Sequence, residues 1–213
     1  EVEIPELKPS DVLIRVAHVG VCATDLEIYN GTLGYYKNGM ASYPVIPGHE
    51  FSGRIVAIGQ NVNKFVENDQ VVVECIQSCG SCVECRSGNF IGCESRIELG
   101  VFRRNGAYAD YVVVPSRFAH KIPSGLDMRK AALAEPVAVA LKGLRRLFPF
   151  IQGAPEQYHC GVVGAGPLGH ICAKILNHQG YQVTAFDRQR ERLDFFENTN
   201  IATSTDLDDL KSC

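Results

Sequence analysis

Four cysteines in one short loop constrain this chain more than any other feature of its sequence. The run C-x2-C-x2-C-x7-C lies in a segment that also contains Gly and Ser, and its members are Cys79, Cys82, Cys85 and Cys93. Thiols at these spacings can converge on one tetrahedral metal ion, and Zn²⁺ accepts four thiolates at roughly 2.3 Å each. We therefore expect a closed structural zinc site in a lobe spanning residues 75–95.

Length and composition exclude several classes of protein. A chain of 213 residues can form one large domain or two ordinary ones. The formal net charge of −3 does not favour a nucleic-acid or membrane-surface partner, and no apolar run approaches the roughly 18 residues that span a bilayer. Because the nine cysteines are odd in number and five of them have metal-site settings, we expect a reducing, cytoplasmic location rather than disulfides.

The first 125 or so residues consist mainly of short runs rich in Val, Ile and Tyr, each bounded by turn residues. Such runs at this spacing predict a compact antiparallel barrel or sandwich. The expected strands are Val12 to Val16, Gly53 to Ile58, Gln70 to Glu74 and Tyr108 to Val114.

The remainder of the chain reads as helix and then as alternating strand and helix. Residues 127–147 have good helix propensity, Pro136 should begin a fresh helical turn, and residues 149–155 form a plausible hinge. We therefore expect one domain over residues 1–154 and the beginning of another over 155–213. In the second, strands 158–163 and 182–186 with helices 168–179 and 188–197 predict a βαβ unit and a parallel sheet.

A glycine-rich turn joins the first strand and helix of this βαβ unit. Its sequence is Gly164-Ala165-Gly166-Pro167-Leu168-Gly169, which is the pattern G-x-G-x-x-G. The first Gly permits the tight turn, the second lets the backbone approach a pyrophosphate, and the third allows close helix–strand packing. The phosphates would lie against the N-terminus of the helix, so the turn predicts a dinucleotide site.

A carboxylate in the right place favours NAD as the dinucleotide. Asp187 follows the second strand 18 residues after Gly169, where it can accept the ribose 2′-OH and would repel a 2′-phosphate. The neighbouring Arg188 leaves NADP as the less favoured choice. The structural alternative is a glycine-rich turn followed by an Asp that only caps a helix.

A second set of potential metal ligands is scattered along the chain. Cys22 follows a strand, His49 and Glu50 are adjacent, and Glu135 precedes a proline. Singly each has an ordinary explanation in the core or in a surface turn. Together they supply a thiolate, an imidazole and one or two carboxylates, which suit an open zinc site with a position for water or an alcohol.

These motifs together resemble one known family. The pattern Gly48-His49-Glu50-x-x-Gly53-x5-Gly59-x-x-Val62 is similar to the signature of the zinc-containing medium-chain alcohol dehydrogenases. The four-cysteine loop, the Cys-x-Thr-Asp turn and G-x-G-x-x-G follow in the order expected for that family. The resemblance implies a mixed fold, in which a GroES-like β-barrel catalytic domain precedes an α/β Rossmann nucleotide-binding domain that is incomplete in this chain.

The resemblance also implies roles for individual residues. Cys22 and His49 match the ligands of the catalytic zinc, and Glu50 matches a carboxylate that binds the metal or exchanges with its water. Glu135 begins Glu-Pro-Val-Ala, which is similar to the polyol, sugar and threonine dehydrogenase branch; which glutamate is the third ligand stays open. Thr24 matches the hydroxyl that bonds the substrate oxygen, and the four-cysteine loop matches the structural zinc.

The function implied is an oxidoreductase that uses two zinc ions and NAD. It would transfer hydride between the nicotinamide and the secondary alcohol of a small polyol, sugar or hydroxy amino acid, as a homodimer or homotetramer. Asp25 would make supporting or backbone contacts. Glu27 stands where many relatives have a His, so it could relay protons, bind a substrate hydroxyl or face water.

Two other interpretations remain open. The four-cysteine lobe could belong to a zinc-ribbon-like module that binds nucleic acid or protein, although the chain has no basic stripe. The chain could also be a catalytically inactive piece of a longer enzyme, because it starts without Met and contains only about one βαβ unit. A dinucleotide site needs strands from both halves of a Rossmann sheet, so we expect weak or absent NAD binding by these residues alone.

Overall fold

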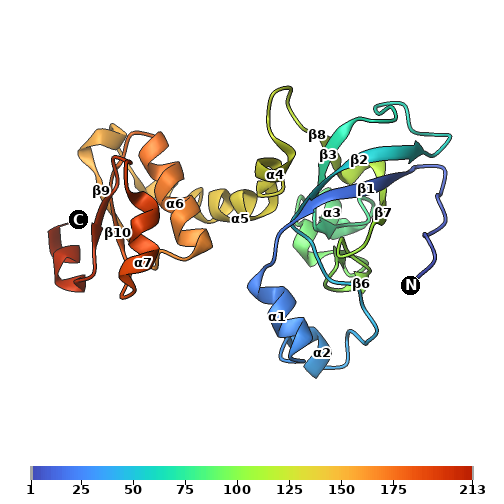
Figure 1. Ribbon diagram of the computed structural model, residues 1–213, viewed down its shortest axis with the longest axis horizontal. Helices are drawn as coiled ribbons and strands as arrows, with labels where there is room; N and C mark the ends of the chain where they lie inside the picture. Colours follow the sequence, from blue (N-terminus) through green and yellow to red (C-terminus); the bar gives the residue numbers. More distant parts are fainter. Residues whose placement is uncertain (1, 213) are drawn as a thin grey trace. The chain divides into compact units, whose positions relative to one another are not determined.

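The computed structural model describes residues 2–212, and the chain divides into two compact units, Glu1–Glu135 and Pro136–Cys213 (Figure 1). The sequence placed the boundary at residues 154–155, whereas this division falls earlier. The reason is that Leu144, Phe148 and Ile151 pack into the core of the second unit. Each unit is described by itself below.

An antiparallel sheet of five strands organises the first unit, in the order β7-β1-β2-β3-β8 (Figure 1). This confirms the expected antiparallel arrangement of the strands; among the described residues the sheet has β7 and β8 at its ends and is not closed into a barrel. Its strands are β1 (Asp11–Val19), β2 (Phe51–Ile58), β3 (Gln70–Val73), β7 (Tyr111–Pro115) and β8 (Ala119–Lys121).

Apolar residues on one face of this sheet form the main core of the first unit. Val12 and Ile14 of β1 are fully buried, as are Ile55 of β2 and Val71 of β3. The four predicted strands are therefore confirmed, with different ends. The fourth begins at Tyr111 rather than at residue 108, because the side chain at 108 is used in a loop contact described below.

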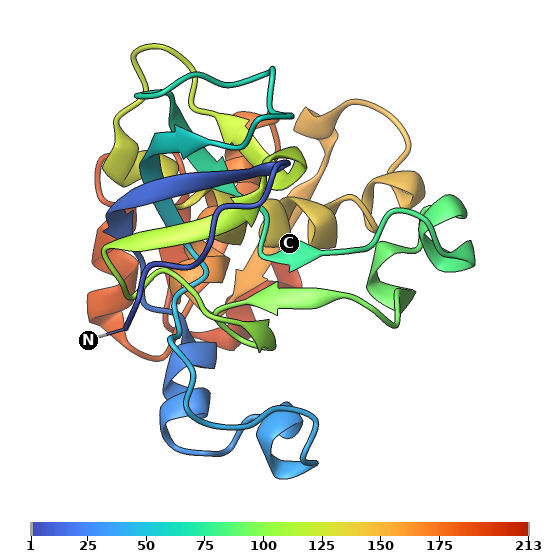
Figure 2. The same ribbon diagram turned by 90° about the vertical axis from the view of Figure 1, so that its right-hand side faces the viewer.

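A smaller sheet, in the order β4-β5-β6, carries the four-cysteine lobe (Figure 2). Its strands β4 (Ile76–Gln77), β5 (Ile97–Leu99) and β6 (Arg103–Arg104) have two or three residues each, too few for a periodic signal. The lobe between β4 and β5 contains α3 (Val83–Arg86) and the 3₁₀ turn η1 (Phe90–Gly92).

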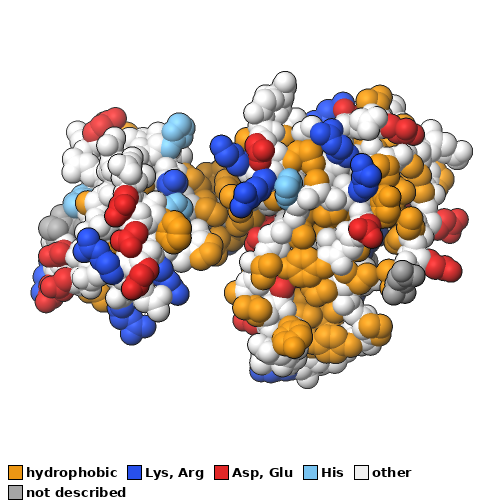
Figure 3. Space-filling model, in the orientation of Figure 1, with side chains coloured by type: hydrophobic (Ala, Val, Ile, Leu, Met, Phe, Trp, Pro, Cys, Tyr) orange, Lys and Arg blue, Asp and Glu red, His pale blue; other side chains and the backbone are white. Residues whose placement is uncertain are grey.

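Between β1 and β2 the chain forms two short helices, α1 (Ala23–Tyr29) and α2 (Gly34–Lys37). They pack on a third core cluster, formed by buried Ile28, Cys75, Val101 and Phe102. Apolar side chains gather on the surface of this region (Figure 3). This segment is important because it holds part of the candidate site.

The predicted helix over residues 127–147 is two helices, α4 (Met128–Ala131) and α5 (Ala134–Leu144). The Asp127 side chain caps α4 by accepting from the backbone N–H groups of Arg129 and Lys130. Pro136 lies in the first turn of α5, as expected from its missing N–H. Short 3₁₀ turns lie in the connections on either side of these helices. η2 (Ser116–Phe118) precedes them, and η3 (Phe148–Phe150) and η4 (Pro155–Gln157) come after them.

The second unit has a parallel sheet in the order β11-β10-β9 with helix α6 packed on it (Figure 1). This confirms the predicted βαβ unit. Its elements are β9 (His159–Val163), α6 (Pro167–His178), β10 (Gln182–Phe186), α7 (Arg190–Leu193), η5 (Asp194–Phe196), β11 (Ala202–Ser204) and η6 (Leu207–Ser212).

Two features of this unit differ from the sequence prediction. The helix expected over residues 188–197 has one α-turn followed by a 3₁₀ turn, and Asn198 with φ 62° then leaves helical geometry. Strand β11 was missed because its sequence, Ala-Thr-Ser, is polar and short. In the part of the chain that the structure describes, no helix is long and apolar enough to cross a membrane.

Candidate metal centres and nucleotide-binding turn

The first unit brings three of the predicted ligands together. One ligand atom each from Cys22, His49 and Glu50 lies within 4.8 Å of the other two. Tetrahedral coordination at zinc bond lengths of roughly 2.0–2.3 Å separates ligand atoms by about 3.3–3.8 Å. The three groups are therefore close to the spacing that a bound zinc would impose.

Local chain geometry explains this convergence of ligands. Cys22 is the N-cap residue of α1, where extended backbone turns into helix. His49 and Glu50 come directly before β2, which pairs with the strand that precedes Cys22. Gly20 lets the two segments meet, since a Cβ there would lie 2.7 Å from Glu50 Oε2.

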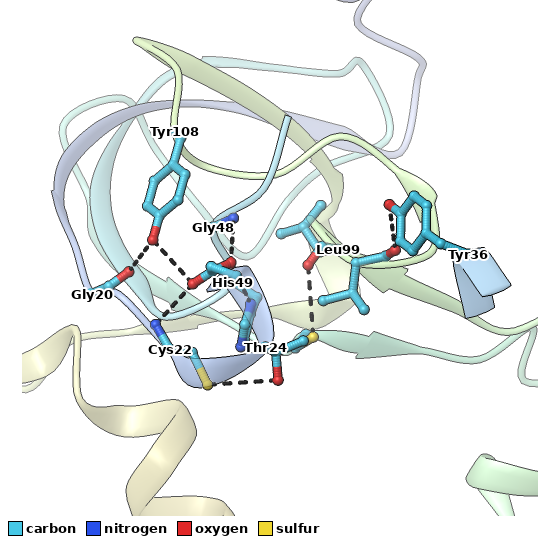
Figure 4. A network of polar contacts seen from close by, with 11 residues as sticks. Gly20, Cys22, Thr24, Tyr36, Gly48, His49, Leu99 and Tyr108 are labelled. Atoms are coloured by element: carbon cyan, nitrogen blue, oxygen red, sulfur yellow. Dashed lines mark hydrogen bonds and ion pairs between the residues drawn. The ribbon is translucent and has the colours of Figure 1, made fainter. Parts of the chain in front are cut away.

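Buried Asp25 holds the segment of Cys22 and the segment of His49 and Glu50 together through hydrogen bonds. Its carboxylate accepts from the backbone N–H of Cys22 at 2.8 Å and from that of Gly48 at 3.2 Å. It also accepts from the Tyr108 hydroxyl at 3.0 Å, and the same hydroxyl donates to the Gly20 carbonyl (Figure 4). The expectation that Asp25 makes backbone contacts is thus confirmed.

The imidazole of His49 lies beside the Asp25 carboxylate. Its Nδ1 is buried with no hydrogen bond to any described residue, and Asp25 Oδ1 lies 3.5 Å away. A carboxylate behind a histidine orients the ring and raises its basicity at many metal sites. The arrangement of Asp25 and His49 has that form.

The charges at this site fit a divalent cation. Burial raises the pKa of the Cys22 thiol, and the Glu50 carboxylate raises it further. Burial also raises the pKa of Glu135, which feels the opposing fields of His49 and Glu50. Several buried acids facing one another disfavour ionisation unless a cation compensates, and a zinc ion would supply that charge.

Glu135 lies within electrostatic range of this cluster but does not share its close spacing. Its ligand atoms fall outside the group of three whose separations are all within 4.8 Å. Of the two candidate carboxylates, Glu50 is therefore the one already in position, while Glu135 is half-buried nearby.

Thr24 and Glu27 lie on α1 with different surroundings. The Thr24 hydroxyl accepts from the Cys22 thiol at 3.8 Å, and Figure 4 shows these two side chains directed toward one another beside His49. Thr24 is thus placed next to a metal ligand. Glu27 is exposed, and its role among the three alternatives stays a prediction.

The four cysteines of the lobe also converge, with one Sγ from each lying within 4.8 Å of the other three. The Cys79 and Cys85 sulfurs are 3.8 Å apart. Backbone N–H groups of Ser81 and Cys82, each 3.4 Å from Cys79 Sγ, lower the pKa of Cys79 to about 5. Four convergent sulfurs, one of them stabilised as a thiolate, fit a closed zinc site.

In the second unit the glycine-rich turn has the geometry that its pattern predicts. Gly164 has φ 98°, in the left-handed region that favours glycine. Gly166 is the N-cap of α6, and Pro167 and Leu168 begin the helix. A Cβ on Gly169 would lie 1.7 Å from the Gly164 carbonyl oxygen, so this position requires glycine for helix–strand packing.

Asp187 faces the same turn and is already hydrogen-bonded. Its carboxylate accepts from the backbone N–H of Ala165 and of Gln189, both at 2.9 Å, and it pairs with Arg192 at 3.3 Å. The N–H donors of Gln189 and Ala165 lower the pKa of this carboxyl. Both the cofactor and the structural interpretation of Asp187 therefore have a geometric basis.

Sequence reasoning missed the roles of Tyr108 and Gly20. Tyr108 was expected as the first residue of a strand, but its hydroxyl hydrogen-bonds to the Gly20 carbonyl and to Asp25. Gly48, with φ 94°, lies against it, and a Cβ there would meet the Tyr108 ring at 2.9 Å. The two hydrogen bonds of Tyr108 join residues 88 and 83 positions apart, so no local pattern could have predicted them.

Comparisons with known proteins agree with this arrangement. Residues 8–124 match the family model described as the alcohol dehydrogenase GroES-like domain. D-altritol 5-dehydrogenase of Agrobacterium fabrum is 33% identical over 205 residues, which are 96% of this chain and 59% of that protein. L-threonine 3-dehydrogenase of Proteus mirabilis is 34% identical over 208 residues, covering 97% of this chain and 58% of that protein.

A solved structure shows the same fold. A zinc-binding dehydrogenase from Sinorhizobium meliloti, bound to NADP, superposes with a TM-score of 0.84 at 29% identity, over 96% of this chain and 57% of that one. This chain therefore spans somewhat more than half the length of the relatives it matches. With its GroES-like domain and the partial Rossmann unit that follows, the chain belongs to the zinc-containing medium-chain alcohol dehydrogenase family.

Proposed function

We propose that this chain belongs to a zinc- and NAD-dependent dehydrogenase that oxidises the secondary alcohol of a polyol, sugar or hydroxy amino acid. The convergence of Cys22, His49 and Glu50 carries the proposal. One thiolate and one carboxylate neutralise Zn²⁺ and leave it a good Lewis acid. The names of the altritol and threonine dehydrogenases support this substrate class.

Cys22, His49 and Glu50 would hold the catalytic zinc, and Glu135 could replace or supplement Glu50. Bound zinc lowers the pKa of a coordinated hydroxyl, which eases loss of its proton near neutral pH. Thr24 would hydrogen-bond the substrate oxygen and take up that proton while its own hydroxyl proton passes onward to water. Asp25 would keep the His49 ring oriented through its position beside Nδ1.

The four-cysteine lobe would hold a second, structural zinc. Its closed ligand set leaves no position for substrate, so it would contribute stability rather than chemistry. The glycine-rich turn Gly164–Gly169 would hold the pyrophosphate of the cofactor, and Asp187 the ribose. We propose NAD rather than NADP, because the Asp187 carboxylate would repel the 2′-phosphate of NADP. One related structure nevertheless contains NADP.

The reducing conditions that free thiols need make the cytoplasm the proposed location. A homodimer or homotetramer is the proposed assembly, which light scattering of the purified protein would test.

Metal analysis together with a substrate screen tests the proposed function. The purified full-length protein should contain two zinc equivalents and form NADH, read at 340 nm, with at least one member of a panel of alditols, sugars and L-threonine. The His49→Ala variant should lose one zinc equivalent and its turnover. The matched control is His120→Ala, because His120 is exposed on β8 and pairs with Glu74.

The control variant should keep both metals and its activity. Protein with at most one zinc and no NADH formation from any member of the panel would reject the proposal. A salt-dependent affinity for DNA or RNA would instead favour a zinc-ribbon-like binding module.

A further inference from the structure

Tyr35 of α2 lies beside the end of the four-cysteine lobe. Arg96, which follows the lobe, and Arg103 of β6 reach Tyr35 by different routes. Neither route is part of the metal sites described above.

The first route is a hydrogen-bond network. Arg96 donates to the Ile91 carbonyl, two residues before the ligand Cys93, at 2.6 Å. It also donates to the Tyr35 hydroxyl at 2.9 Å and to Glu98 Oε1 at 3.0 Å. The Tyr35 hydroxyl in turn donates to Glu98 Oε1 at 2.8 Å, so the three side chains form a closed triangle.

The second route is a stack of flat groups. Arg103 donates to the Glu94 carbonyl, one residue after Cys93, at 2.8 Å. Its guanidinium lies over the Phe102 ring, 4.4 Å from the centroid. The Tyr35 ring also stacks on the Phe102 ring, with the two ring centroids 4.7 Å apart. Backbone on both sides of Cys93 is thereby linked to the same tyrosine.

Tyr35 is joined in turn to the helix that carries Thr24 and Asp25. The turn between α1 and α2 is closed by backbone bonds from Thr32 and Leu33 to the Glu27 carbonyl. Ile28 of α1 is buried in the same core cluster as Phe102, against which Tyr35 packs. A displacement of Tyr35 therefore reaches α1 through both the chain and the core.

From these contacts we propose that Tyr35 couples the four-cysteine site to α1, so that metal in the lobe holds Thr24 and Asp25 in their positions. The inference rests on the proposed assignment of two metal sites. Metal bound by Cys93 and its partners orders the Ile91 and Glu94 carbonyls, which fixes both arginines. Their contacts then favour the docked position of Tyr35. Such coupling is a free energy shared by two sites, and by linkage it acts in both directions.

The chain offers a matched pair of variants. Tyr35→Phe keeps the ring on Phe102 but removes the hydroxyl that meets Arg96 and Glu98. The control is Tyr36→Phe, on the same short helix, which removes a hydroxyl that donates to the Val101 carbonyl at 3.1 Å (Figure 4). Tyr35→Phe loses two hydrogen bonds, with Arg96 and with Glu98. Tyr36→Phe loses one, to the β5–β6 connection, and does not touch the arginine route.

Amide hydrogen exchange of residues 23–29 is the readout, measured in zinc-loaded protein and in the Cys85→Ser variant, whose lobe is empty. In the wild type and in Tyr36→Phe, emptying the lobe should accelerate this exchange about tenfold, which corresponds to one hydrogen bond to a charged group. In Tyr35→Phe, exchange should already be about tenfold faster with full zinc and should not rise further.

Where Cys85→Ser does not fold, stepwise chelation of the folded protein replaces it. Alkylation of Cys82 or of Cys22, read by mass spectrometry, then reports which site has opened. Two outcomes would overturn the proposed coupling. One is equal amide exchange rates of α1 in the two tyrosine variants, and the other is an exchange rate of α1 that does not change when the lobe loses its metal. A wild type without two zinc equivalents would overturn the proposed function instead, so the two failures are distinguishable.

Discussion

At the scale of single residues, Asp25 is the most connected side chain of the candidate zinc site. It holds the backbone of Cys22 and Gly48, and its carboxylate lies beside His49 Nδ1. We predict that Asp25→Asn weakens metal binding at this site about 10- to 100-fold, because the charge behind the imidazole is lost. Competition with a chelator that reports free zinc measures the change.

The control for this prediction is Asp127→Asn, which alters the cap of α4 outside the site. It should lower stability slightly and leave metal affinity unchanged. Equal loss of affinity in both variants would mean that the effect is not specific to the carboxylate beside His49.

Asp187 provides a pH-dependent prediction at the same scale. Its side chain is 6% exposed, and N–H donors hold its folded pKa below the ordinary value of 3.8. A carboxyl with a lowered folded pKa stabilises the fold above its unfolded pKa, and this stability is lost as pH falls through the folded value. The second unit should therefore lose stability below about pH 4, and less so in Asp187→Ala.

Urea unfolding followed by amide exchange of β10 between pH 2 and 6 measures this dependence. The comparison is Asp194→Ala, since Asp194 is exposed and pairs with Arg190 only at 3.9 Å. A pH profile in Asp187→Ala as steep as that of the wild type would contradict the assigned role of the two N–H donors.

At the scale of elements, substitutions at two glycines of the glycine-rich turn should distinguish effects on stability from effects on cofactor binding. A Cβ at position 169 would collide with the Gly164 carbonyl, whereas one at position 166 meets nothing within 4 Å. We predict that Gly169→Ala lowers the stability of the second unit by about 1–3 kcal/mol, as overpacking does. Gly166→Ala should leave stability unchanged and weaken cofactor binding, because its Cβ would occupy the space proposed for the pyrophosphate.

Chemical denaturation and NAD titration of both variants, made in the full-length protein, test this prediction. The prediction fails if Gly166→Ala is the less stable of the two, or if it binds NAD as tightly as the wild type does.

At the scale of the whole molecule, the two units have separate cores that share no residue. Loss of the lobe metal should therefore act on one unit only. We predict that Cys85→Ser lowers the stability of the first unit by about 4 kcal/mol or more, the range associated with loss of a structural metal. Amide exchange should accelerate in β1 and stay unchanged in β10.

Cys172→Ser makes the reciprocal comparison, because Cys172 packs against the core of the second unit. It should accelerate exchange in β10 and not in β1. Acceleration of both strands by either variant would show that the two cores unfold together.

Much of the candidate site could be predicted from sequence, because its signals are local. The spacing of the four cysteines predicted their convergence, and His49 lies beside Glu50 in the chain. Glu135 was predicted from its own short motif, but its ligand atoms do not join the close group of Cys22, His49 and Glu50.

The sequence by itself determined the ligand types, the glycine-rich turn and the alternation of the long strands, since each depends on residues close together in the chain. Only the tertiary structure decided that the five-stranded sheet stays open among the described residues, that Tyr108 supports Asp25, and that Tyr35 meets the end of the cysteine lobe. The physical reason is the separation along the chain between the residues that make contact. Those contacts join residues 61 to 88 positions apart, and their partners are selected by packing and hydrogen bonding rather than by spacing.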